Sequence, residues 1–200
     1  MVIDLSAAVL AGGRSSRMGF DKAFLNFNGR LLIREIAERL AGLSDDVMVV
    51  VGTKDTEPFR AVLPQGVRVL KDSIYTMSPV GGIITAAINS HHSYFAAIAT
   101  DMPFVDVRII ERLRSLAEGH SAAVPVLNGR LEPLCSVYSS NAVSRLEING
   151  LKSVRDMVAL LPDAVFVNAE SLRKIDPELR SFKNVNTMEE YLNLKGNDGM

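Results

Sequence analysis

Three short apolar runs, each ended by glycine or aspartate, constrain the fold more than any other feature of this chain. They cover residues 6–10, 46–51 and 94–100. Strands of this length that are apolar on both faces are typical of the centre of a parallel sheet covered by helices. Between them, apolar residues recur at helical spacing, most clearly at 31–43. The alternation of strand and helix predicts an open α/β sheet with right-handed crossovers.

The pattern changes after residue 121. Two β-rich segments, 122–127 and 134–138, flank the turn dipeptide Asn128-Gly129, which is typical of a hairpin. We therefore expect an antiparallel edge or insertion on a mostly parallel central sheet. Because no repeat or linker interrupts the 200 residues, we expect one domain over 1–200, with 195–200 as a frayed tail.

The composition excludes several classes of protein. A formal net charge of -1 and the lack of a basic stripe argue against a nucleic-acid partner. No apolar run approaches the ~18–20 residues of a membrane helix, so no membrane contact is expected. The single cysteine, Cys135, cannot form an internal disulfide, and its apolar strand context predicts a packed side chain. Together these features predict a cytoplasmic protein.

The loop after the first strand carries the strongest functional signal. It combines two glycines with three cations: Gly12, Gly13, Arg14, Arg17 and Lys22. Glycines let backbone amides approach a phosphate, and the three cations would neutralise much of a triphosphate. Phe20-Asp21 separates Gly19 from Lys22, which excludes a Walker loop, and the adjacent glycines exclude the dinucleotide fingerprint. We therefore predict that the loop 10–22 binds a nucleoside triphosphate.

Residues after two later strands extend this site. Asp101 follows the strand 94–100, at the sheet edge where α/β proteins place ligands, and predicts a Mg²⁺ site against phosphate oxygens. Asp72 follows a short strand at 67–70 and is placed to reach the ribose or the base. Gly81-Gly82 opens a helix whose N-terminus is expected to face an anion.

Taken together, these motifs resemble the molybdenum cofactor guanylyltransferase family, a branch of the nucleotidyltransferases with a Rossmann-like, three-layer fold. The resemblance runs over the whole chain. It rests on residues 10–22, Pro79 to Gly82, 101–104, Glu132-Pro133-Leu134 with Tyr138, and 184–190. The chain differs at Ser78-Pro79-Val80, where the family often has Gly-Pro-Leu, and at Gly52-Thr53-Lys54, where the family often has Asn.

The resemblance implies a reaction, in which the terminal phosphate of molybdopterin attacks the α-phosphorus of GTP and pyrophosphate leaves. It assigns nucleotide or metal contacts to Leu10, Ala11, Gly12, Lys22, Asp72 and Asp101, and pterin-side roles to Asn184 and Asn186. With Gly13, Arg14 and Gly82 from the glycine-rich segments, these residues form the predicted nucleotide site. Arg17, Lys22 and Asp101, with Mg²⁺ on Asp101, are the predicted catalytic residues. Cofactor-insertion proteins and recipient molybdoenzymes are the implied downstream partners.

Two alternatives remain open at this point. A related nucleotidyltransferase would keep the same site but use CTP or a sugar phosphate. A non-catalytic homologue would bind the nucleotide without turnover, although the presence of Arg17, Lys22 and Asp101 favours an enzyme.

Overall fold

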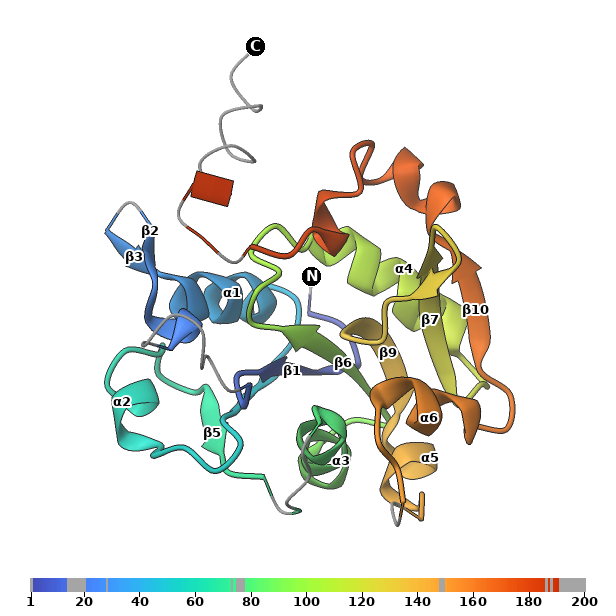
Figure 1. Ribbon diagram of the computed structural model, residues 1–200, viewed down its shortest axis with the longest axis horizontal. Coiled ribbons are helices and arrows are strands. Elements are labelled where there is room, and N and C mark those ends of the chain that lie inside the picture. Colours follow the sequence, from blue (N-terminus) through green and yellow to red (C-terminus); the bar gives the residue numbers. More distant parts are fainter. Residues whose placement is uncertain are drawn as a thin grey trace.

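The computed structural model describes residues 2–13, 21–27, 29–72, 74, 78–147, 150–185, 187 and 189–190. An eight-stranded sheet crosses this part of the chain, with the strand order β10-β7-β9-β6-β1-β4-β5 and β8 paired to β7 (Figure 1). Its strands are β1 (Ser6–Leu10), β4 (Asp46–Val50), β5 (Arg68–Leu70), β6 (Tyr94–Ala99), β7 (Ala122–Leu127), β8 (Arg130–Leu131), β9 (Cys135–Ser139) and β10 (Val165–Asn168). A separate two-stranded ribbon joins β2 (Asn26–Phe27) to β3 (Arg30–Leu31).

Parallel pairing dominates the sheet. β1 lies between β4 and β6 and is parallel to both, and β5 is parallel to β4. The antiparallel partners are β9, which pairs with β6 and β7, and β8, which pairs with β7. This confirms the predicted α/β fold class with an antiparallel insertion.

Helices cover both faces of the sheet and make three layers. They are α1 (Leu32–Ala41), α2 (Glu57–Arg60), α3 (Val80–Asn89), α4 (Val107–Ala117), α5 (Ser140–Ser144) and α6 (Val154–Ala159), with 3-10 helices at Lys22–Phe24, Ala169–Lys174 and Arg180–Phe182. In Figure 1, α1 and α4 lie on one side of the sheet, and α3, α5 and α6 lie on the other.

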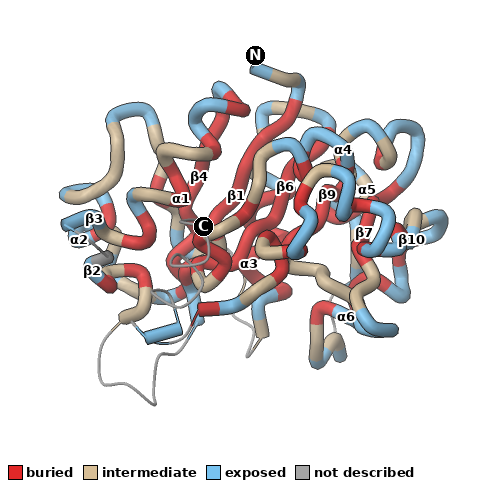
Figure 2. Tube along the Cα trace, turned by 90° about the horizontal axis from the view of Figure 1, so that it is seen from above, coloured by how far each residue is buried: buried red, intermediate tan, exposed pale blue. Residues whose placement is uncertain are grey.

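Two hydrophobic cores follow from the alternation of side chains along the strands. Ala7 and Val9 of β1 join α1 and α4 in one core, whereas Ala8 joins α3 and α6 in the other. Figure 2 shows the central strands β1, β4 and β6 as buried, which is why their sequences are apolar on both faces. Cys135 is a free, fully buried thiol at the start of β9, as predicted.

The predicted hairpin is present, but its returning strand is broken. Asn128 and Gly129 have φ values of 50° and 73°, the positive values that a tight turn of this kind requires. The chain then pairs with β7 as β8, leaves the ladder around Pro133, and pairs again as β9. A proline cannot donate a ladder hydrogen bond, which explains the interruption.

Other boundaries differ from the prediction. The sequence also predicts a helix at 141–148, but α5 ends at Ser144. β10 was not predicted, because four residues carry too little pattern. Thr187 and Glu190 form a capping-box pattern in the sequence, and the Glu190 amide donates a hydrogen bond to Thr187 Oγ1 as this pattern predicts. Residues 195–200 and the frayed tail predicted there lie outside the described residues. The described part of the chain has no helix long and apolar enough to cross a membrane. A single domain over 1–200 stays a prediction.

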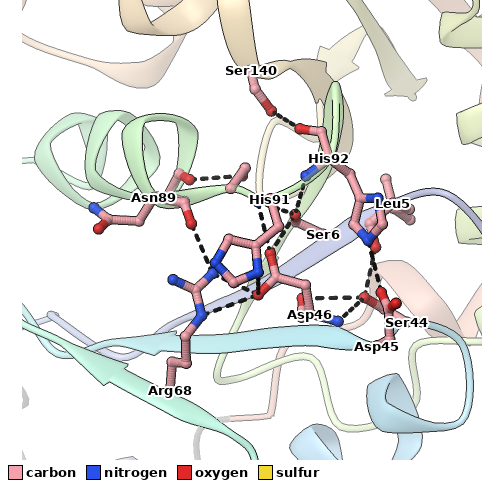
Figure 3. A network of polar contacts seen from close by, with 12 residues as sticks. Leu5, Ser6, Ser44, Asp45, Asp46, Arg68, Asn89, His91, His92 and Ser140 are labelled. Atoms are coloured by element: carbon pink, nitrogen blue, oxygen red, sulfur yellow. Dashed lines mark hydrogen bonds and ion pairs between the residues drawn. The ribbon is translucent and has the colours of Figure 1, made fainter.

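A buried polar network ties together the amino-terminal ends of the parallel strands (Figure 3). At its centre Asp46 Oδ1 accepts hydrogen bonds from Arg68 Nε and Nη2, at 3.0 and 2.5 Å. Asp46 Oδ2 accepts from Ser6 Oγ at 2.6 Å and from the His91 amide at 3.0 Å. Burial alone would raise the pKa of Asp46, but these hydrogen bonds and the Arg68 charge outweigh it and lower that pKa.

Candidate active site

The carboxyl ends of the parallel strands meet at the opposite edge of the sheet. From β1 the chain proceeds outward to β4 and β5, and it returns through α3 to β6 on the other side of β1. The point where the strand order reverses therefore lies between β1 and β6, and such points are where α/β sheets bind ligands. Thr100 joins the ends of the two strands here, because its Oγ1 donates a hydrogen bond to the Leu10 carbonyl at 2.7 Å.

A cavity of about 390 Å³ opens at this edge. That volume lies within the usual range of about 300–1,000 Å³ for small-molecule sites. All of the predicted nucleotide residues that the structure describes line it: Leu10, Ala11, Gly12, Gly13, Lys22, Asp72, Gly82 and Asp101. Segments that are distant in sequence thus form one wall around a single space.

Two glycines meet at the base of the cavity. The ideal Cβ position of Gly12 lies 3.0 Å from Gly52 N and Cα, and that of Gly52 lies 3.0 Å from Gly12 Cα. Gly52 also has a φ of 66°, which disfavours any side chain. The loop after β1 and the loop after β4 are therefore in backbone contact, which residues with side chains do not permit.

Asp101 and Lys22 are two of the charged residues that line the cavity. Asp101 lies two residues after the end of β6, and Asp21 begins the 3-10 helix of Lys22 by accepting a hydrogen bond from the Ala23 amide. Burial raises the pKa of Asp101, and the nearby positive charge of Lys22 partly opposes this effect. A carboxyl group whose pKa is raised by burial, beside a lysine in a cleft, is the kind of group that functional sites concentrate.

Asp72 supplies an acceptor that no other described residue uses. Its Oδ1 atom is buried and has no hydrogen-bond partner among the described residues. Burial raises the pKa of Asp72, partly opposed by a hydrogen bond from the Gly52 backbone. Gly82, in the first turn of α3, lies beside it, since a Cβ there would be 3.6 Å from Asp72 Oδ1. A buried acceptor without a partner costs stability, so it marks a place where a ligand donor would bind.

The carboxy-terminal segment passes close to Asp101. The Val185 amide donates to the Asp101 carbonyl at 2.7 Å, which brings the neighbouring Asn184 to this edge of the sheet. Asn184 is exposed and does not line the cavity. Arg14, Arg17 and Asn186, which the sequence also assigned to the site, lie outside the described residues. Their predicted roles stay predictions.

In the described ranges, no group of three or more acidic, histidine or cysteine side chains is placed so that it could hold a metal ion. A metal ion that needs three or more of these side chains as ligands does not fit such a site. Mg²⁺ does fit, because it usually keeps several waters and binds one or two carboxylates together with substrate phosphates. Asp101, an oxygen ligand beside the predicted phosphate loop, is the residue that would hold it.

Several residues that the sequence did not assign to the site also line or shape it. Thr53, Thr100 and Leu134 line the cavity, and Lys54 bonds to the loop behind it. Thr53 and Lys54 follow β4, so their position after a central strand was the signal that could have identified them. Leu134 arrives through the antiparallel insertion, whose pairing could not be read from a local pattern.

Comparisons with known proteins agree with this geometry. Residues 7–165 match the sequence model of the MobA-like NTP transferase domain. A "probable molybdenum cofactor guanylyltransferase" of Methanosarcina mazei is 36% identical, over 96% of this chain and 90% of that protein. The molybdenum cofactor guanylyltransferase of Syntrophotalea carbinolica is 30% identical, over 93% of this chain and 88% of that protein.

Solved structures show the same fold. The molybdopterin-guanine dinucleotide biosynthesis protein A of Archaeoglobus fulgidus superposes with a TM-score of 0.80 at 25% identity, covering 96% of this chain and all of that one. Nucleotidyltransferases of other specificity share only the fold, as in the 2-C-methyl-D-erythritol 4-phosphate cytidylyltransferase of Thermus thermophilus, with a TM-score of 0.64 at 17% identity. The chain therefore belongs to the family of MobA-like NTP transferase domains, in the branch of the molybdenum cofactor guanylyltransferases.

Proposed function

We propose that this protein transfers GMP from GTP to the terminal phosphate of molybdopterin or its metal-bearing form, in the cytoplasm, and releases pyrophosphate. One observation carries the proposal. Gly12, Gly13, Lys22 and Asp101 converge on one cavity at the point where the strand order reverses, together with Asp72 Oδ1, which has no hydrogen-bond partner in the described part of the chain. The names of the relatives supply the two substrates.

The reaction needs positioning and charge neutralisation rather than a covalent intermediate. An ionised oxygen of the molybdopterin phosphate forms a bond to the α-phosphorus of GTP, while the bond between the α-phosphorus and its bridging oxygen breaks. The attacking phosphate carries no proton that must be removed, so no general base is required. Lys22 would neutralise charge on the triphosphate and on the leaving pyrophosphate.

Mg²⁺ on Asp101 is the second part of the proposal. When bound, the ion would supply charge neutralisation across the phosphate oxygens. Asp101 would orient it from the end of β6, and Lys22 would lie across the same cavity. The C-terminal segment at Asn184, held to Asp101 through Val185, would face the pterin.

Asp72 would read the nucleotide itself. Its unpartnered Oδ1 would accept a hydrogen bond from a ribose hydroxyl or from the guanine N–H groups. Gly82 leaves room for this contact, because the space a methyl group would fill there is bounded by Leu10, Val50 and Asp72.

The test is turnover with purified components. The protein incubated with molybdopterin and Mg-GTP should release pyrophosphate and form the guanine dinucleotide. Lys22→Ala and Asp101→Asn should each reduce the rate about 100-fold or more, as loss of a charge-stabilising group does. Both variants should unfold at temperatures near that of the native protein, which shows that the fold survives.

Nucleotide choice is tested in parallel. A ligand that binds only the native state raises its melting temperature, so the four triphosphates can be ranked by thermal shift. GTP should stabilise most. A clear preference for CTP would exclude the guanylyl reaction, and binding of GTP without pyrophosphate release would indicate a non-catalytic homologue.

A further inference from the structure

Lys54 joins the two ends of the glycine-rich loop. Its Nζ donates to the Ala11 carbonyl, where the loop leaves β1, and to Asp21 Oδ2, where the loop ends; both distances are 2.6 Å. The side chains of Lys54 and Asp21 are only 27% and 23% exposed. A short, largely desolvated ion pair that also satisfies a backbone carbonyl is much stronger than a surface salt bridge.

The loop after β4 places this side chain. Gly52 turns the chain with its positive φ, and the Lys54 amide donates to the Val51 carbonyl at 3.2 Å. Thr53 faces the cavity, whereas Lys54 is not among the described residues that line it. Lys54 therefore contacts Ala11 and Asp21 from outside the cavity, and it would act on a bound nucleotide through other residues.

The neighbour of Asp21 makes this contact relevant to binding. Asp21 Oδ1 accepts from the Ala23 amide at 3.1 Å and so begins the short 3-10 helix that carries Lys22. With its other oxygen held by Lys54, Asp21 has a defined orientation. The backbone that presents Lys22 to the cavity is thereby fixed to the end of β4.

Charge adds a second consequence. Asp21 itself lines the cavity in which the triphosphate is proposed to bind. A carboxylate without a counter-charge there would repel the phosphates, and the repulsion is stronger in a partly desolvated cleft than in water. The ammonium group of Lys54 neutralises this carboxylate from behind.

We propose that Lys54 is a positioning residue for triphosphate binding. Its ammonium group holds Ala11 and Asp21 together, at the two ends of the loop, and neutralises the charge of Asp21. This inference rests on the proposed function only in assuming that the cavity binds a triphosphate. It does not depend on which base is chosen or on the identity of the acceptor.

The experiment measures binding of Mg-GTP and of Mg-tripolyphosphate, which has no base, by isothermal titration calorimetry. Lys54→Met should weaken both ligands by the same factor, about 10- to 100-fold, the effect of losing hydrogen bonds to a charged group. Lys54→Arg should restore most of the affinity. Lys152→Met removes an equal charge from an exposed position outside the cavity and should leave binding unchanged.

The double variant Lys54→Met with Asp21→Asn separates charge from structure. If Lys54 cancels the charge of Asp21, removing both charges should recover at least half of the lost affinity on a logarithmic scale. If Lys54 only supports the backbone and has no electrostatic role, the double variant should bind no better than Lys54→Met. That result would overturn the proposal. If Lys54→Met does not fold, Lys54→Gln replaces it in the same cycle.

Steady-state kinetics give a further readout. The KM for GTP should rise in Lys54→Met while kcat changes less than about threefold, because the reacting groups are still present. A fall in kcat at unchanged KM would contradict the proposal. If the native protein binds Mg-tripolyphosphate but transfers no GMP, the proposed reaction is excluded. The binding titrations still test the role of Lys54 in that case.

Discussion

Substitution of Gly82 by alanine should separate stability from ligand binding. The added methyl group would lie 3.3 Å from Leu10 Cδ2, 3.6 Å from Asp72 Oδ1 and 3.8 Å from Val50 Cγ1. All three residues line the cavity, so the methyl group would reduce the space left for the nucleotide. The tightest contact is with the end of a flexible leucine side chain, which can move by a few tenths of an ångström.

The effect on stability is small and favourable. Alanine is preferred over glycine within a helix by about 0.5–1 kcal/mol, and the first turn of α3 favours the lower value. For a chain of 200 residues, the unfolding entropy of about 2 cal/mol/K per residue converts this into a rise of about 1 °C in melting temperature. Strain at Leu10 offsets part of that gain. We therefore expect the melting temperature to stay within about 1 °C of the native value.

The effect on binding should be large. Forcing a methyl group into a filled site costs about 1–3 kcal/mol, which weakens Mg-GTP about 5- to 150-fold. Calorimetric titration measures this change, and scanning fluorimetry measures the stability. Ile88→Ala serves as the control, because Ile88 lies near the other end of α3 and its side chain is exposed. Native affinity in Gly82→Ala would refute the placement of the nucleotide beside this glycine.

Two further predictions follow from the carboxylates. Asp46→Asn should lower the free energy of unfolding by about 2–3 kcal/mol, because it weakens a buried ion pair. The melting temperature should fall by about 5–8 °C, and the KM for GTP should not change. Since the folded-state pKa of Asp46 is lowered, the stability difference between the native protein and the variant should be present above pH ~4 and shrink as the pH falls further. Thermal unfolding at pH 7 and at pH 3 measures this difference. A stability difference that does not change with pH would contradict the prediction. Asp72→Asn should raise the melting temperature of the ligand-free protein at pH 7, because burial raises the pKa of Asp72 and its ionisation costs stability as the pH rises through the ordinary aspartate range. The same variant should bind GTP about tenfold more weakly, and a lower melting temperature together with native affinity would show that Asp72 is a structural residue.

The sequence predicts the parallel core well, because its strands are buried on both faces and leave a continuous apolar pattern. Residues 6–10 and 122–127 were predicted with the bounds that the structure shows. β10 is short and half-exposed, and its pairing with β7 depends on contacts between distant segments. Such strands carry little local signal.

The candidate site was predictable where function imposes a motif. Glycines and cations after a strand, and Asp101 at the end of another, have few structural reasons to occur together. Lys54 belongs to no such motif, and a lysine in a turn is usually a solvated side chain, so its sequence context does not indicate a role. Its role depends on the orientation of one side chain toward a loop 43 positions away, which only the folded chain shows.

The contact between Gly12 and Gly52 has a consequence for how this site can diversify. Each glycine occupies space that a side chain on the other would need, so the two positions can vary only together although they are 40 positions apart. A loop grafted from a relative with a side chain at either place would push β1 and β4 apart at their carboxyl ends. Redesign of this protein for another nucleotide should therefore exchange the two loops together, and libraries that randomise one of them alone should yield few folded variants.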